Sequence, residues 1–157
     1  MTRRASRREF LLTAGGVAAG IGLASVGAIA PASATPAAMQ EAIRKVVGSA
    51  RVNPGRVKLE LPPLSENGNA VPLAVSVESP MSEADHVRAI HVFTEKNPQP
   101  DVVSFHLGPR AGRASVATRI RLADTQTVVA VCELSDGSFW SGRADVVVTL
   151  AACLEDG

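Results

Sequence analysis

The chain has 157 residues, of which 16 are Lys or Arg and 15 are Asp or Glu, so that its formal charge at pH 7 is +1. This balance excludes the strongly basic surface with which most nucleic-acid-binding proteins hold phosphates. The length suits one domain with a short additional segment and is too small for two domains of ordinary size.

The first 34 residues have the features of an export signal. Four arginines at positions 3, 4, 7 and 8 precede an uncharged stretch over residues 10–30, and residues 6–12 (Ser-Arg-Arg-Glu-Phe-Leu-Leu) match the twin-arginine pattern. A transmembrane anchor is the alternative, because the stretch is nearly long enough to span a bilayer, but its many glycines argue against it. Small residues at positions 32–34 predict cleavage after Ala34. We therefore expect a periplasmic protein with no membrane attachment after cleavage.

Removal of residues 1–34 takes away four arginines and one glutamate, which leaves 12 basic and 14 acidic side chains and a formal charge of −2. The remaining part of the chain suits a single domain with a core of its own. We expect this domain to cover residues 35–150, and residues 151–157 to form a C-terminal arm. Twin-arginine export carries proteins that have already folded, around a cofactor or with a partner subunit, so a partner is also expected.

The mature chain begins with one short predicted helix and continues with strands. Apolar residues recur at helical spacing between positions 37 and 47, and Gly48 follows as a natural end. Strands are predicted for seven runs separated by Gly, Pro, Asn and Asp, namely residues 56–61, 71–78, 87–94, 102–107, 114–122, 127–134 and 139–150. This pattern predicts an all-β fold, an immunoglobulin-like β-sandwich of about seven strands with a short N-terminal helix and a flexible C-terminal arm.

Two cysteines follow the predicted signal. Cys132 lies in a predicted strand on the same face as Ala130 and Leu134, which we expect to face the core, and buried thiols are usually unreactive. Cys153 lies after the last predicted strand, where the backbone is expected to be mobile. In an oxidising compartment a Cys132–Cys153 disulfide is the alternative, and position alone leaves both interpretations open.

Other polar and aromatic residues give weaker signals. His86, His91 and His106 have no compact metal-ligand spacing, and we expect His91 and His106 on the less buried face of their strands. Phe139 and Trp140 either pack in the core or anchor a partner. Four arginines are better explained by a solvated sheet face than by an anion site: Arg110, Arg113, Arg119 and Arg121. The sequence therefore predicts no catalytic residue, no metal and no cofactor.

Four short runs and the tail carry a family resemblance. The runs are residues 66–72 (Glu-Asn-Gly-Asn-Ala-Val-Pro), 77–81 (Val-Glu-Ser-Pro-Met), 90–93 (Ile-His-Val-Phe) and 95–98 (Glu-Lys-Asn-Pro). With a last strand that ends shortly before a cysteine, they resemble the SoxY family, the sulfur-compound carrier subunits of periplasmic thiosulfate oxidation. The resemblance extends over nearly all of the mature chain.

The resemblance implies a non-catalytic carrier that pairs with a SoxZ-like subunit and holds its sulfur intermediate covalently on Cys153, while other periplasmic sulfur-oxidising enzymes load and unload the arm. The SoxY arm normally ends in Gly-Gly-Cys-Gly-Gly, whereas residues 151–157 here are Ala-Ala-Cys-Leu-Glu-Asp-Gly. Alanine and leucine restrict the backbone more than glycine does, and nearby acidic groups disfavour a thiolate. We therefore expect a SoxY-related subgroup with an Ala-Ala-Cys arm.

A second hypothesis belongs to another class of protein. In it, the chain is a non-catalytic immunoglobulin-like binding or scaffold protein of the periplasm, in which Cys132 and Cys153 form a disulfide or remain inert. A small metalloprotein built on the three histidines ranks last.

Overall fold

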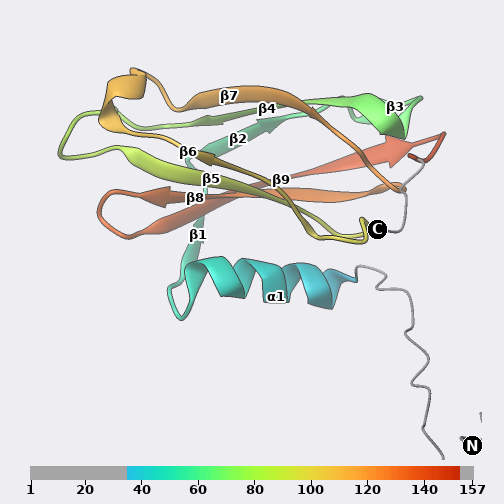
Figure 1. Cartoon of the computed structure of the whole chain (residues 1–157), viewed down its shortest axis with the longest axis horizontal. Helices are drawn as coiled ribbons and strands as arrows, with labels where there is room; N and C mark the ends of the chain where they lie inside the picture. The colour runs from blue at the N-terminus through green and yellow to red at the C-terminus, as the bar shows by residue number, and fades with distance from the viewer. Residues whose placement is uncertain (1–34, 153–157) are drawn as a thin grey trace, which may run out of the picture. The chain divides into compact units, whose positions relative to one another are not determined.

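The computed structural model describes residues 35–152, and these form a β-sandwich with a helix against one outer face. Within this range the larger sheet has the strand order β1-β9-β8-β5-β6, with β3 also paired to β9, and the smaller sheet has the order β2-β4-β7. Figure 1 shows the two sheets as stacked layers, with α1 on the side of the larger sheet that faces away from the smaller one. The predicted immunoglobulin-like sandwich is confirmed.

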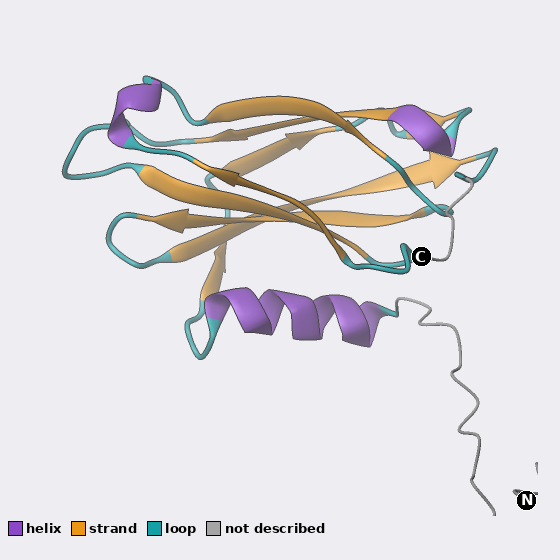
Figure 2. Cartoon of the chain, viewed as in Figure 1, coloured by secondary structure: helices purple, strands orange, loops and turns teal. Residues whose placement is uncertain are grey.

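The elements follow one another along the chain with short connections. In chain order they are α1 (Pro36–Val47), β1 (Val52–Pro54), β2 (Val57–Glu60), β3 (Leu64–Ser65), the 3-10 helix η1 (Gly68–Ala70), β4 (Val71–Val77), β5 (Val87–Thr94), β6 (Asp101–His106), the 3-10 helix η2 (Pro109–Ala111), β7 (Ser115–Ile120), β8 (Gln126–Leu134) and β9 (Phe139–Val148). Figure 2 shows α1 as the one long helix in this range.

Local sequence explains where α1 begins and ends. The side chain of Thr35 accepts a hydrogen bond from the backbone N–H of Ala38 at 3.2 Å, and Pro36 occupies the first turn, where a missing N–H costs nothing. Gly48, with φ of 62°, ends the helix because it takes a positive φ without steric cost. No helix between residues 35 and 152 is long and apolar enough to cross a membrane.

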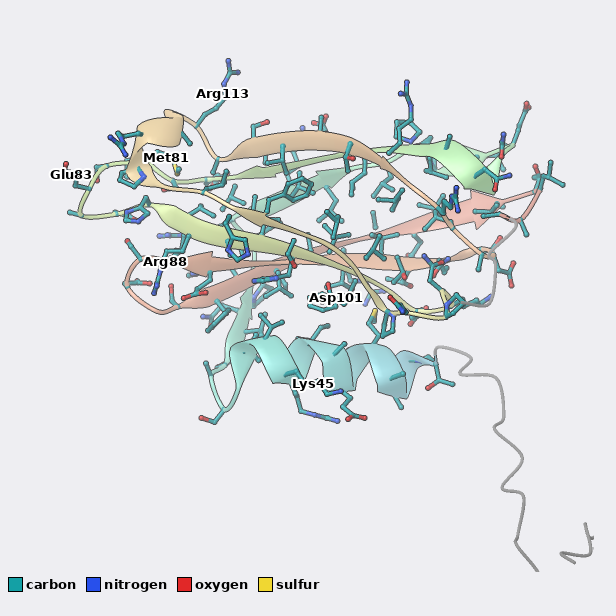
Figure 3. All side chains as sticks on the ribbon, viewed as in Figure 1. Lys45, Met81, Glu83, Arg88, Asp101 and Arg113 are labelled. Carbon is teal, nitrogen blue, oxygen red and sulfur yellow. The ribbon has the colours of Figure 1, made fainter. Side chains whose placement is uncertain are left out.

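The larger sheet is buried on both faces where α1 covers it. Met39, Ile43 and Val47 lie on one stripe of α1 and pack against Phe93 and Val131. The spacing of these three residues matches the helical repeat, so that a single face carries all of them. Figure 3 shows Lys45 on the outward side of the same helix.

The main core lies between the two sheets. From the larger sheet, β8 contributes Val128, Ala130 and Cys132, each with no exposed surface. The predicted orientation of Cys132 is therefore confirmed. Val131, on the opposite face of β8, instead contacts the helix cluster. From the smaller sheet, β4 contributes every second residue of its length, namely Val71, Leu73, Val75 and Val77.

The seven predicted strands are all present, with ends that differ from the prediction by a few residues at most. Two additional strands, β1 and β3, were not predicted. They have three and two residues and pair in parallel with β9. Such short segments have no readable alternation, and a distant strand determines their conformation.

Candidate functional site

The predicted sulfur-attachment residue Cys153 lies outside the described residues, as do the rest of the arm (residues 154–157) and the predicted signal peptide (residues 1–34). The structure therefore describes the base from which Cys153 extends. We call residues 150–152 the arm root. Its last residue, Ala152, is bonded directly to Cys153.

The arm root is held to the domain by a backbone clasp. We define this clasp as three hydrogen bonds, from Gly68 N–H to Leu150 O at 2.8 Å, from Leu122 N–H to Gly68 O at 2.8 Å, and from Ala152 N–H to Leu122 O at 3.1 Å. Ala152 is only 9% exposed. Within the predicted arm (residues 151–157), Ala152 is thus bonded to the domain.

Gly68 makes this close approach possible because it has no side chain. A Cβ atom at this position would overlap the carbonyl oxygen of Leu122, and it would lie 2.8 Å from the nitrogen of Ala152 and 3.1 Å from the oxygen of Leu150. All three atoms belong to the backbone, so no side-chain rotation relieves the contact. Any larger residue must displace either the arm root or the segment at Leu122.

A buried amide network supports the segment that contains Leu122. Asn97, which is 6% exposed, donates from Nδ2 to Arg121 O at 2.8 Å and accepts at Oδ1 from Ala123 N–H at 3.0 Å. Gln126 donates to the same Oδ1 at 3.0 Å and accepts from Lys96 N–H at 2.8 Å. The two amides thus fix both residues that flank Leu122, whose carbonyl receives the Ala152 N–H.

The sequence analysis therefore did not identify Gly68, Leu122 or the Asn97–Gln126 pair as residues that hold the arm root. Gly68 and Asn97 stand within the runs 66–72 and 95–98, which suggested a family but no structural role for either residue. The structure shows that these two runs, about 30 residues apart in sequence, meet at the same end of the sandwich through Leu122.

The second cysteine has the environment of an inert thiol. Cys132 has no exposed surface, lies within the main core and is a free thiol in the structure. Burial raises its pKa to about 11, because the core does not solvate a thiolate. At neutral pH it is protonated and shielded from reagents.

A Cys132–Cys153 disulfide does not fit the described residues. Cys132 pairs with Trp140 in β9, and β9 continues for eight residues to Val148, a distance of about 27 Å at the usual rise of a strand. The chain then reaches Ala152, which is bonded to Leu122. Because a disulfide requires Cα atoms within about 7 Å, Ala152 would have to leave the clasp and Cys132 the core.

Two of the three histidines, His91 and His106, lie as predicted on the less buried face of their strands. His91 is half-buried and His106 exposed, and both lie on the side of the larger sheet away from the main core, with ring centroids 6.2 Å apart. His91 Nδ1 is 2.8 Å from Ser104 Oγ. Within residues 35–152, no three His, Cys, Asp or Glu side chains gather as a metal site would require.

His91 predicts a pH dependence of stability. Its pKa is lowered first by burial and then by His106, while Asp101 and Glu133 raise it. Since the unfolded chain then binds the proton more readily, the free energy of unfolding should fall as the pH drops through about 6.5. Urea unfolding at pH 7.5 and pH 5.5 measures this loss, and His91→Gln should reduce it. His86→Gln is the control, and equal losses in wild type and His91→Gln would contradict the assignment.

The remaining candidates have structural environments. Phe139 packs under α1, and Trp140 packs against the main core with the guanidinium of Arg56 4.8 Å from its ring centroid. These contacts favour the packing interpretation over a partner anchor. Arg113 projects from the loop after η2 away from the sheets, as Figure 3 shows. The other arginines of this group, Arg110, Arg119 and Arg121, are also exposed.

An exposed apolar patch lies beside the arm root. The exposed large hydrophobic residues of the described chain are Leu64, Val147 and Leu150, with exposed fractions of 54%, 48% and 62%. Leu64 and Val147 are register partners in β3 and β9, and Leu150 belongs to the arm root. Among the described residues, the exposed large hydrophobic side chains thus belong to β3, β9 and the arm root.

The fold is a small immunoglobulin-like sandwich, and a backbone clasp holds the segment that directly precedes Cys153. The model of the family described as sulfur oxidation protein SoxY matches residues 43–153. The sulfur carrier protein SoxY from Chlorobium limicola f thiosulfatophilum is similar in structure, with a TM-score of 0.62 and 29% identity over 73% of this chain and 98% of that one. The chain belongs to the SoxY family.

More distant structures share the fold alone. The superoxide reductase (neelaredoxin) from Ignicoccus hospitalis has a TM-score of 0.54 and 18% identity over 60% of this chain and 80% of that one. The superoxide reductase from Nanoarchaeum equitans has a TM-score of 0.52 and 10% identity over 61% of this chain and 100% of that one. No curated protein matches the sequence significantly.

Proposed function

We propose that this protein is a periplasmic sulfur carrier that binds a sulfur intermediate covalently on Cys153. The observation that carries the proposal is the SoxY family match over residues 43–153, which ends at this cysteine. The similar structure from Chlorobium limicola is described as a sulfur carrier protein. The clasp is consistent with the same assignment, because it fixes Ala152, the residue immediately before Cys153, to the domain.

The burial of Cys132 makes Cys153 the better candidate for the carrier thiol. A carrier thiol must meet the active sites of other proteins, which requires access to solvent and to a base that removes its proton. Cys132 lacks access because it is completely buried.

Loading of the carrier is an oxidation. Joining a thiolate to the outer sulfur of thiosulfate forms a sulfur–sulfur bond and releases two electrons, which a loading partner must accept.

The carrier itself catalyses nothing in this proposal. A SoxZ-like subunit forms the heterodimer, and periplasmic enzymes of the sulfur-oxidation system load and unload Cys153. No cofactor is required beyond the sulfur adduct. Export through the twin-arginine pathway and cleavage after Ala34 bring the folded carrier to the compartment where these partners act.

The mass of the intact mature protein tests the proposal directly. The chain is co-expressed with a SoxZ-like subunit and exported. Its intact mass is measured before and after exposure to thiosulfate and loading enzymes, and again after treatment with reductant. We expect a reductant-sensitive mass increase that peptide mapping assigns to Cys153. An unmodified protein would overturn the carrier role for this donor, and a mass lower by two hydrogens would favour the disulfide-bonded scaffold.

A further inference from the structure

The contacts of the arm root differ in kind from those of the domain core. Leu150 is 62% exposed, and Ala152 is the single residue of the arm root that is buried. The segment is therefore held mainly by backbone hydrogen bonds, each of which contributes about 0.5–1.5 kcal/mol net. Segments with few buried apolar contacts open at a free energy well below that of global unfolding.

Opening this clasp would change how far Cys153 reaches. Each residue of extended chain adds up to about 3.3–3.6 Å. With the clasp closed, Cys153 follows directly after Ala152, whose N–H is bonded to the oxygen of Leu122. Release of residues 150–152 would allow the thiol to extend about 10 Å farther from the domain.

We propose that Gly68 is a positioning residue whose backbone clasp on residues 150–152 sets the reach of the Cys153 arm, with a closed short form and an open long form. Gly68 contacts no substrate and acts through Leu122 and the arm root. Its role follows from sterics, because a Cβ would meet three backbone atoms of the clasp at once. The inference takes its functional meaning from the proposed carrier role of Cys153, whereas its test does not depend on that role.

Gly68→Ala should open the clasp, and Gly108→Ala is the matched control. Gly108 directly precedes the 3-10 helix η2, as Gly68 begins η1, but a Cβ at position 108 has no neighbouring atom within 4 Å. In hydrogen exchange read by NMR, the amide of Ala152 should exchange about tenfold faster or more in Gly68→Ala, as expected when roughly one hydrogen bond is lost. It should exchange at the wild-type rate in Gly108→Ala.

A second readout reports on the arm itself. A nitroxide spin label on Cys153 should move faster in Gly68→Ala than in wild type, with no change in Gly108→Ala, and Cys132 should stay unlabelled because it is buried. If Gly68→Ala does not fold, Ala152→Pro is the second variant, since proline lacks the N–H that bonds Leu122. Wild-type exchange and label motion in a folded Gly68→Ala protein, or wild-type label motion in Ala152→Pro, would overturn the clasp.

These measurements separate the two proposals. They use purified mature protein without thiosulfate or partner enzymes, so a failure to form a sulfur adduct leaves them unaffected. Faster spin-label motion in Gly68→Ala, together with no sulfur adduct on the wild-type protein, would support the clasp and reject the carrier role. Unchanged spin-label motion in Gly68→Ala, together with a sulfur adduct on the wild-type protein, would reject the clasp and support the carrier role.

Discussion

Serine at position 153 is expected to abolish the sulfur adduct completely while leaving the stability of the domain unchanged. A serine hydroxyl cannot form the sulfur–sulfur bond, and Cys153 follows Ala152, the last residue that the structure describes, in the arm that we expect to be exposed. Surface changes of this kind usually alter the free energy of unfolding by less than about 0.5 kcal/mol. Intact mass after loading measures the adduct, and urea unfolding measures the stability.

Cys132→Ser is the matched control, because it makes the same atomic change in the core. Cys132 has no exposed surface, so burial of an additional hydroxyl should lower the free energy of unfolding by about 1–3 kcal/mol. The adduct should remain, since Cys132 is distant from the arm root along β8 and β9. Loss of the adduct in Cys132→Ser, or its survival in Cys153→Ser, would contradict the assignment of the carrier thiol.

The strands and the inward face of β8 could be predicted because their signals are local. Side chains alternate between the two faces of a strand, so the sequence places Cys132 on the same face as Ala130 and Leu134. Likewise, Pro36 and Gly48 mark the ends of α1 within the sequence that they terminate. These signals lie within the segments themselves, although the strands are completed by pairing with distant ones.

The clasp could not be predicted for the opposite reason. Its hydrogen bonds join residues 68, 122, 150 and 152 through backbone atoms, and backbone atoms are the same in every residue type. A glycine in a loop reads as a turn signal, so the sequence did not distinguish Gly68 from Gly108. Only the packing of three separate segments shows that Gly68 needs its missing side chain whereas Gly108 does not.

The helix position was not predictable for a related reason. The stripe of Met39, Ile43 and Val47 indicates that α1 packs on something, but it does not identify the surface. That surface is the outer face of β5 and β8, where Phe93 and Val131 are fully buried. Apolar residues on both faces of these strands indicate that both faces are covered, which is a signal that alternation arguments overlook.

Asn97→Ala is expected to destabilise the domain by about 3 kcal/mol, which corresponds to a fall in melting temperature of roughly 10 °C. The change leaves Arg121 O and Ala123 N–H without their partner, and Nε2 of Gln126 keeps only its bond to the oxygen of Asp124. Orphaned groups of this kind cost about 1–3 kcal/mol each where they are buried. Thermal and urea unfolding measure the loss.

Asn53→Ala provides the comparison, because Asn53 is half-buried and makes one side-chain hydrogen bond, from Nδ2 to Phe139 O at 3.3 Å. Its loss should cost about 1 kcal/mol. Asn97→Ala should in addition speed hydrogen exchange at Ala152, since Asn97 fixes both neighbours of the Leu122 carbonyl that holds the arm root. Equal destabilisation by both variants, or an Ala152 amide that stays protected in Asn97→Ala, would mean that the amide network does not support the clasp.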